Sequence, residues 1–341
     1  MGILEFSRFF HIFAKNSTAT HMKASDIELK HLRSRFVSDT NVPIQIIHSP
    51  FFEERLALCE EEYLAKTKYE NLVSLIDERF DGNPNLFLEY YHQIRDRIIN
   101  TVKGTKEFND FLCNDSIMAN IKPLVSNRNL YTQEQDGCMF ISFDMKKANF
   151  QTLRYVNPKI VFDTETYEEF IGLFTDLEYI KNSKYTRQVI FGNMNPKRIM
   201  TVEKMLTNEL ASKISEEYKE IPLELFSLNA DEIIFKFKGN EEEFERIPNI
   251  GDYVFKDITY RCNKFKLHHR QFELATSSSS LNVYEKEDYL DGHRRHLHCV
   301  PSTYYPQVYK HLRGEKINPH DLIFYYEHEL CQFMNPIKLV K

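Results

Sequence analysis

The stretch Met139–Asp144 reads Met-Phe-Ile-Ser-Phe-Asp, a hydrophobic run of strand length that ends in an aspartate. Farther along the chain, Leu223–Leu228 and Ile233–Phe237 are also apolar, and the residues Asn-Ala-Asp-Glu separate them. Two apolar runs around a short polar turn predict a β-hairpin, with Asp231 and Glu232 at its tip. If this hairpin lies beside the first strand, three carboxylates meet at one end of a small sheet. Such a group suits Mg²⁺, which binds carboxylates together with substrate phosphates.

The composition is that of a folded globular protein with a large core. The chain has 341 residues, of which 42% are hydrophobic and 28% are charged, and this length is enough for two or three domains. Only 10 residues are glycine, which argues against a loop-rich β-sandwich, and the apolar periodicity favours helices with a modest sheet. Because the formal net charge is −6, a polyanionic partner would have to bind at a local basic face.

The sequence predicts an intracellular protein, cytoplasmic or nuclear, that does not interact with a membrane. No apolar run approaches the roughly 20 residues needed to cross a bilayer. The N-terminus lacks the basic segment and the long apolar core of a signal peptide. The six cysteines are scattered and form no Cys-x-x-Cys pair, which suits a reducing compartment.

Residues 1–125 are expected to be mostly helical. Helices are predicted from Pro50 to about Lys68 and from Asn85 to about Val102, the second one after the start signal Asp-Gly-Asn-Pro. The short segment Val42–Ile47 has the composition of a strand. The polar residues 127–137 are expected to connect this region to the next one.

Helical spacing returns after the first strand, and short strands are expected toward the end of the chain. Apolar residues recur at helical intervals in residues 166–180, 185–191 and 201–218. The remaining expectations are an acidic turn at 241–243, short strands at 253–255 and 259–261, and a final helix at 320–334.

The acids, together with a basic helix between them, occur in an order that resembles a known family. Residues 184–192 read Lys-Tyr-Thr-Arg-Gln-Val-Ile-Phe-Gly, and a helix there would place Lys184 and Arg187 on one face. An apolar strand ending in Asp144, then this helix, then a hairpin with an acidic pair resembles the palm domain of template-dependent polymerases and related nucleotidyltransferases. The resemblance covers roughly residues 138–240, about a third of the chain.

The resemblance implies an α+β fold with three parts. A mostly helical N-terminal region would span residues 1–125, and a palm-like catalytic domain, with an antiparallel sheet packed on helices, would span 126–250. A smaller mixed, thumb-like region would span 251–341. The N-terminal helices would serve as fingers or would bind a protein partner.

The implied activity is the addition of nucleotides from NTPs or dNTPs to the 3′ end of a nucleic acid. Asp144 and Asp231 would hold two Mg²⁺ or Mn²⁺ ions, and Glu232 would be a third, outer ligand. Lys184 and Arg187 would contact the triphosphate and neutralise charge in the transition state. Met145 and Phe150, which follow the first aspartate, would also contact the nucleotide. The choice between ribose and deoxyribose stays open, because the smaller Asn149 precedes the bulky Phe150.

A basic stretch in the C-terminal third is predicted to contact the nucleic acid. Aromatic residues alternate with its cations, and such a pattern allows cations to bind phosphates while rings stack on bases. The residues assigned to this surface are Arg261, Lys264, Lys266, Arg270, Arg294 and Arg295.

Each of these features also has an ordinary structural interpretation. Asp144 can cap the turn after its strand, and Asp231 suits an exposed hairpin tip. Histidines and a cysteine in residues 292–299 could bind Zn²⁺, but their spacing matches no zinc signature. The same acids could serve a metal-dependent nuclease, and a palm without activity could act as a scaffold. The sequence does not distinguish RNA from DNA or establish that a template is used.

Overall fold

The computed structural model describes residues 24–114, 127–274, 279–327 and 329–340, and they form an α+β fold. Among these described residues, helices account for 48% and the strands of a mostly antiparallel sheet for 21%, which confirms the predicted fold class. The described residues divide into two compact units. The terminal unit comprises the chain up to Leu86, Arg270–Val283 and the chain from Cys299, while the central unit comprises Phe87–His269 and Tyr284–His298. The predicted division at residues 125 and 250 stays a prediction.

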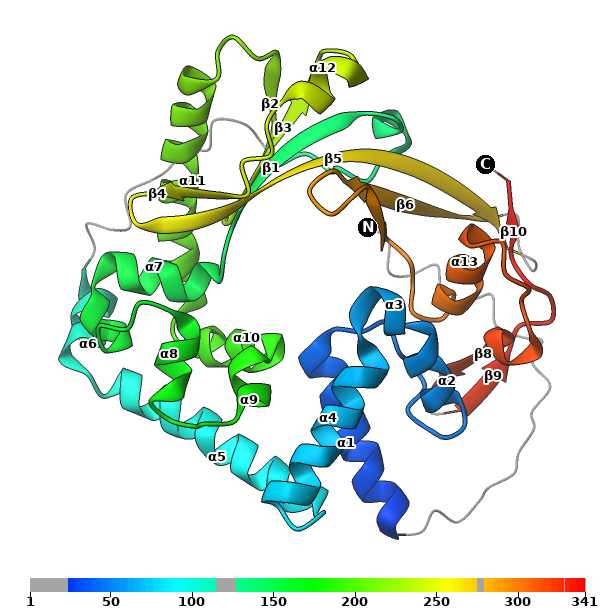
Figure 1. The fold of residues 1–341 in the computed structure, drawn as a ribbon. Coiled ribbons are helices and arrows are strands. Elements are labelled where there is room, and N and C mark those ends of the chain that lie inside the picture. The colour runs from blue at the N-terminus through cyan, green and yellow to red at the C-terminus, as the bar shows by residue number, and fades with distance from the viewer. Residues whose placement is uncertain (1–23, 115–126, 275–278, 328, 341) are drawn as a thin grey trace. The chain divides into compact units, whose positions relative to one another are not determined.

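The terminal unit is built from helices and a small hairpin (Figure 1). Its core contains the fully buried rings of Phe36 and Phe52, which both contact Tyr69 edge to face. Its elements are α1 (Ala24–Thr40), α2 (Phe51–Leu58), α3 (Glu60–Tyr63), α4 (Ala65–Arg79), α13 (Tyr305–Leu312), the 3₁₀ turn η5 (Pro319–Leu322), β8 (Ile323–Tyr326) and β9 (Glu329–Gln332).

Three predictions for the terminal unit are wrong in detail. The helix expected from Pro50 to Lys68 is broken at Cys59 and at Leu64, whose φ of 53° lies in the left-handed region. The segment Val42–Ile47 forms no strand. The side chain of Gln45 instead accepts from the N–H of Tyr325 at 3.2 Å and donates to its carbonyl at 2.7 Å, so an amide side chain replaces the backbone ladder.

The final helix expected at residues 320–334 is also wrong. Only a 3₁₀ turn forms there, and the antiparallel pair β8–β9 follows it. The residues Phe-Tyr-Tyr at 324–326 favour a strand over a helix, and the Phe324 ring stacks on Phe333 at 4.2 Å. The preceding helix α13 was not predicted, and its residues Tyr305 and Val308 are buried.

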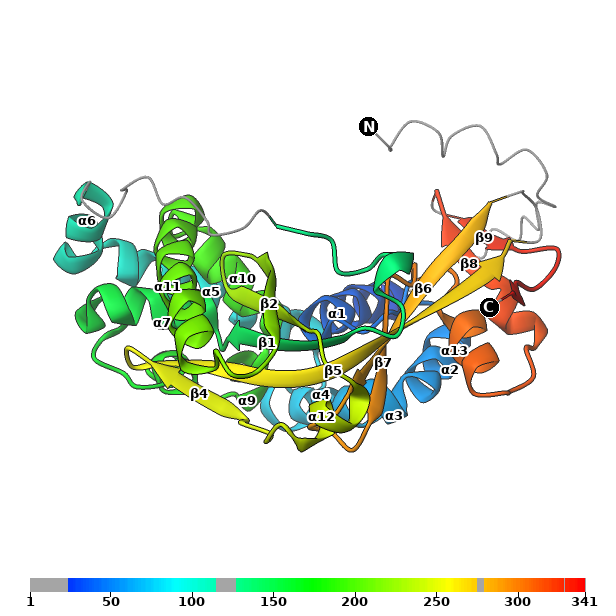
Figure 2. The same cartoon turned by 90° about the horizontal axis from the view of Figure 1, so that it is seen from above.

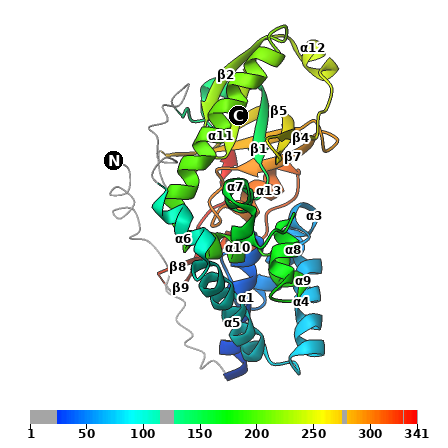
Figure 3. The same cartoon turned by 90° about the vertical axis from the view of Figure 1, so that its left-hand side faces the viewer.

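Most helices of the central unit lie at the predicted positions, but the helical spacing over residues 166–180 corresponds to two short helices with a break at residues 173–177. Figure 3 shows α5 (Pro84–Lys103) beside α8 (Tyr167–Gly172) and α10 (Lys184–Gly192). The hydroxyl of Tyr91 on α5 hydrogen-bonds with Thr186 on α10, and both groups are buried. The other helices are α6 (Lys106–Cys113), α7 (Ala148–Val156), α9 (Glu178–Asn182), α11 (Pro196–Glu217) and α12 (Glu241–Arg246), with 3₁₀ turns η3 (Gln133–Gln135) and η4 (Pro158–Val161).

The expected acidic turn at residues 241–243 is in fact the first turn of α12. Asn240 accepts from the N–H of Glu243, and the Glu243 carboxylate accepts from the N–H of Asn240. This reciprocal capping box provides partners for two backbone N–H groups at the helix start. None of the helices in the described part of the chain is long and apolar enough to span a membrane.

The sheet has the strand order β2-β3-β1-β5-β6-β7, and Figure 2 shows β1 running along the much longer β5. The predicted hairpin is confirmed as β2 (Leu223–Leu228) and β3 (Glu232–Phe237), and β3 pairs antiparallel with β1 (Met139–Met145). The expected short strand at 259–261 is part of β5, which has 16 residues. The remaining strands are β4 (Asp252–Phe255), β5 (Ile258–Glu273), β6 (Ser280–Asp288), β7 (Arg294–His298) and β10 (Lys338–Leu339), of which β4 and β10 pair with β5.

The two faces of this sheet in the central unit have different surroundings. Because side chains alternate along a strand, the register places Asp144, Glu232 and Arg261 together on one face, which we call the acid face. Phe143 and Lys264 lie on the opposite face. Phe143 contacts Tyr253 there, whose hydroxyl donates to Glu217 of α11, so we call this the helix-backed face.

Candidate functional site

The pairing of β1 with β3 brings the predicted acids together. Asp144 lies directly opposite Glu232, and Arg261 of β5 flanks Asp144 on its other side. The N–H of Met145 donates to the carbonyl of Asp231 at 2.8 Å. This bond identifies Asp144 and Glu232 as a non-hydrogen-bonded pair, the class of antiparallel pair in which the side chains lie closest.

The surroundings of the acids disfavour their negative charges. Asp144 has a large accessible area, yet protein groups crowd its carboxylate, and this desolvation raises its pKa, with a further contribution from Asp231. Burial likewise raises the pKa of Glu232, and the charges of Asp144 and Asp231 add to the shift. The cations Lys286, Arg261 and Lys184 act in the opposite direction on Asp144. A cluster of this kind is stabilised by any further positive charge that enters it.

Glu203 of α11 is a fourth acid near this cluster, and the sequence analysis missed it. It is 6% exposed, and burial, followed by the charge of Asp231, raises its pKa to about 7. One turn later, the Thr207 hydroxyl lies 3.2 Å from the carbonyl of Ala230 in the hairpin turn. The sequence contains a signal for this residue, because the charged Glu203 interrupts the apolar stripe of α11 formed by Ile199 and Leu206.

Lys286 of β6 is the second residue that the sequence analysis missed. Its side chain is partly buried, and the ammonium lies 3.9 Å above the centroid of the Phe265 ring. Burial lowers the pKa of Lys286, while Glu232, Asp288 and Asp144 oppose that shift. No motif marked this lysine, since acids at 285 and 287 make it look like part of a solvated charge pattern.

The predicted basic helix lies near the acids. Lys184 is exposed at the first turn of α10, after the capping residue Ser183, and its charge acts on Asp144. Arg187 lies over the ring of Tyr167 with 5.7 Å between the guanidinium and the centroid. Lys147 lies over the same ring at 5.6 Å and forms an ion pair with Glu168. Lys147 and Arg187 thus place two positive charges over the Tyr167 ring, and Lys184 of the same helix as Arg187 acts on Asp144.

Met145 and Phe150 are placed in the core instead of on the surface of the site. Met145 is 2% exposed and lies on the helix-backed face. Phe150 is 1% exposed and packs against Tyr167 and Phe170, with centroids 6.2 Å and 5.9 Å away. Their contact with a nucleotide stays a prediction.

The six basic residues assigned to nucleic acid do not share one face. Arg261 lies on the acid face, 4.0 Å from Asp288, whereas Lys264 is buried on the helix-backed face and Arg270 belongs to the terminal unit. The others face acids: Lys266 binds Glu241 at 2.7 Å, Arg294 lies 3.8 Å from Asp291, and Arg295 lies 3.2 Å from Glu285. Their role in binding nucleic acid stays a prediction.

A polar pocket of about 430 Å³ adjoins the acids. The segment Asn127–Tyr131 forms one wall, and Glu232 and Lys286 contribute to the lining. This segment is attached to β2, because the Ser227 hydroxyl donates to the Asn127 side chain at 2.7 Å and accepts from the N–H of Arg128 at 3.2 Å. The pocket therefore offers charged and amide groups directly beside the acid pair.

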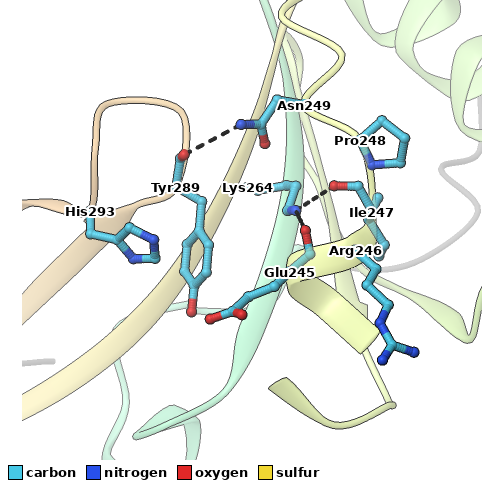
Figure 4. Close-up of a pocket in the computed structure, with 8 residues that line it drawn as sticks. All are labelled: Glu245, Arg246, Ile247, Pro248, Asn249, Lys264, Tyr289 and His293. Atoms are coloured by element: carbon cyan, nitrogen blue, oxygen red, sulfur yellow. Dashed lines mark hydrogen bonds between the residues drawn. The ribbon is translucent and has the colours of Figure 1, made fainter. Parts of the chain in front are cut away.

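A second pocket, of about 390 Å³, contains Lys264 on the helix-backed face (Figure 4). Its walls come from the segment Glu245–Asn249 and from Tyr289 and His293. The Lys264 ammonium donates to the carbonyls of Ile247 at 2.5 Å and Glu245 at 3.3 Å. None of the acids at the end of β1 or in the β2–β3 turn lines this pocket.

The histidines that suggested zinc are engaged with other groups. His268 and His293 both contact Glu287, at 2.6 Å and 3.0 Å, and His298 contacts the Tyr131 hydroxyl at 3.0 Å. Within the described ranges, no three His, Cys, Asp or Glu side chains are placed so that they could hold a metal ion as they stand.

Comparisons with known proteins give no match for this chain. No protein-family model matches the sequence, and neither the curated proteins nor the solved structures contain a match. The geometry of the acid face is therefore the basis of the functional proposal.

Proposed function

We propose that the central unit is a metal-dependent nucleotidyltransferase that adds nucleotides from NTPs or dNTPs to a nucleic-acid 3′ end. The supporting observation is the strand register, which sets Asp144 opposite Glu232 and the hairpin turn with Asp231 next to both. This is the arrangement that the resemblance to polymerase palms requires, and it comes from segments far apart in the sequence.

The acids at the end of β1 and in the β2–β3 turn fit a hard divalent cation. Asp144 and Asp231 would bind Mg²⁺ or Mn²⁺, and Glu232 would lie farther out. Two carboxylates are sufficient, because Mg²⁺ completes its coordination with water and substrate phosphates instead of an all-protein cage. When bound, the metal would increase the acidity of the attacking hydroxyl and neutralise charge on the triphosphate.

The cations around Asp144 would orient the nucleotide. In the transfer, the 3′-oxygen would attack the α-phosphorus, the bond to pyrophosphate would break, and the proton of the hydroxyl would pass to a solvent water. Lys184 and Arg187 would bind the oxygens of the leaving pyrophosphate, where charge develops in the transition state. Arg261 lies on the same face and would contact a phosphate of the acceptor strand.

Replacement of single carboxyl groups tests this proposal. In Asp144→Asn and Asp231→Asn, incorporation of nucleotides on a primed template should fall by a factor of about 10³ or more, the scale of removing a preorganised electrostatic group. The melting temperature should stay the same or rise, since each change relieves repulsion in the cluster. Asp252→Asn is the matched control, because this exposed acid pairs with Lys146 at 2.6 Å.

The same assay separates the competing activities. Incorporation by either variant at the wild-type rate would contradict the proposal. Cleavage of nucleic acid in Mg²⁺ without any triphosphate would instead identify a nuclease. No binding of Mn²⁺, with or without NTP, would support a non-catalytic scaffold.

A further inference from the structure

Lys286 differs from an ordinary partly buried lysine in its hydrogen bonding. Throughout the described segments its ammonium has no hydrogen-bond partner and no carboxylate oxygen within ion-pair distance, and it lies 3.9 Å from the centroid of the Phe265 ring. An ammonium carries three donors, and their desolvation without a partner costs free energy. The three N–H donors of Lys286 are therefore available to a ligand in the pocket that Glu232 also lines.

The carboxylates around Lys286 explain why its positive charge is tolerated there. Glu232, Asp288 and Asp144 all favour the charged form of this lysine, and Arg261 opposes it. Asp288 already has other partners: the Asn263 amide at 3.0 Å and the N–H of Leu290 at 2.8 Å. Three carboxylates thus attract Lys286, and two of them, Glu232 and Asp144, form the pair that would attract a metal ion.

We propose that Lys286 is the resident counter-ion of the acid face and competes there with a divalent cation. A unit positive charge near the carboxylates reduces their attraction for a second cation. The stem of a lysine is flexible and its ammonium is a compact charge that binds phosphate oxygens. A triphosphate would therefore draw Lys286 away from Glu232, so that phosphate binding and metal binding strengthen each other.

This inference rests on the proposed function for the identity of the cation site, but its test does not need turnover. Lys286→Met retains an unbranched stem over Phe265 and removes only the charge. Mn²⁺ titration of the full chain by calorimetry, without nucleotide, should give about tenfold tighter binding for the variant. Lys238→Met is the matched control, because Lys238 pairs with Glu224 at 2.6 Å and has no assigned role, and its Mn²⁺ affinity should equal that of the wild type.

Thermal unfolding gives a second, independent readout. In EDTA, Lys286→Met should melt below the wild type, and Mg²⁺ should restore the melting temperature while NaCl of matched ionic strength should not. The double variant Glu232→Gln, Lys286→Met should recover stability without metal, because the charge that needed Lys286 is gone. If Lys286→Met does not fold in EDTA, recovery of folding in the double variant supports the inference, and failure to recover overturns it.

The outcomes separate this inference from the proposed function. If Lys286→Met binds Mn²⁺ with the wild-type affinity while Asp144→Asn abolishes binding, the counter-ion role is overturned and the metal site stands. If neither the wild type nor Lys286→Met binds Mn²⁺, both ideas are overturned. If adding an NTP analogue tightens Mn²⁺ binding in the wild type and not in Lys286→Met, the coupling through Lys286 is supported.

Discussion

Lys264 and Lys286 lie on neighbouring strands and carry the same charge, but their surroundings differ. Lys264 is 3% exposed on the helix-backed face, donates to two backbone carbonyls and lies 5.0 Å from the Phe244 ring centroid. Among the residues that the structure describes, the Lys286 ammonium has no hydrogen-bond partner, and Lys286 lines a pocket together with Glu232. The Lys264 ammonium donates to the protein itself and therefore stabilises the structure. The Lys286 ammonium lies beside acids and can donate to a ligand.

The largest effect on stability should follow from Lys264→Met. The substitution removes two hydrogen bonds from a charged donor to part-buried carbonyls, each worth about 1.5–3 kcal/mol, so we expect the free energy of unfolding to fall by about 2–4 kcal/mol. Urea denaturation measures this loss, and Mg²⁺ should not restore it, in contrast to Lys286→Met. A loss below about 0.5 kcal/mol, the range of ordinary surface changes, would show that the carbonyls of Glu245 and Ile247 find other partners.

A smaller effect, with a distinctive pH dependence, should follow from Glu203→Gln. The folded-state pKa of Glu203 is raised from 4.5 to about 7. Between these pH values the folded protein keeps a proton that the unfolded chain has lost, so wild-type stability falls as pH rises through this window. Glutamine stays neutral, and the variant should exceed the wild type by about 1–3 kcal/mol at pH 8.

Urea denaturation at pH 4.5 and pH 8 tests this pH dependence. The difference between Glu203→Gln and the wild type should vanish near pH 4.5, where both side chains are neutral. An equal difference at both pH values would mean that packing, and not charge, distinguishes the two proteins. Glu209→Gln on the same helix is a control, since Glu209 is exposed and paired with Lys256.

The strands and long helices of the central unit could be predicted because local patterns determine them. The apolar run before Asp144 and the polar turn before Glu232 correspond to β1 and the β2–β3 hairpin within about a residue. The helix at 184–192 also begins and ends where its spacing indicated. Predictions failed where a distant residue decides the local structure, as at Gln45, whose amide pairs with the backbone of Tyr325.

The roles of Glu203 and Lys286 could not be predicted for a related reason. Each approaches the acids only because of the strand order and the helix packing, with β5 between β1 and β6 and α11 beneath the hairpin turn. The sequence contains both side chains but no information on which acids they will meet. Asp144, Asp231 and Glu232 could be predicted because each of them lies at the end or at the start of a recognisable strand.

The smallest effect on stability should follow from Lys184→Met, which extends the comparison to a third lysine. Like Lys286, Lys184 has no hydrogen bond or ion pair with any residue that the structure describes, and its charge acts on Asp144. We therefore expect the free energy of unfolding to change by less than about 0.5 kcal/mol, as for surface residues without partners. The KM for the triphosphate should nevertheless rise about tenfold, since one cation near the phosphates is lost.

Lys181→Met is the control, because Lys181 pairs with Glu178 at 2.8 Å on the adjacent helix. If Lys184→Met destabilises the protein as much as Lys264→Met does, free donors do not distinguish ligand-binding lysines from structural ones in this fold.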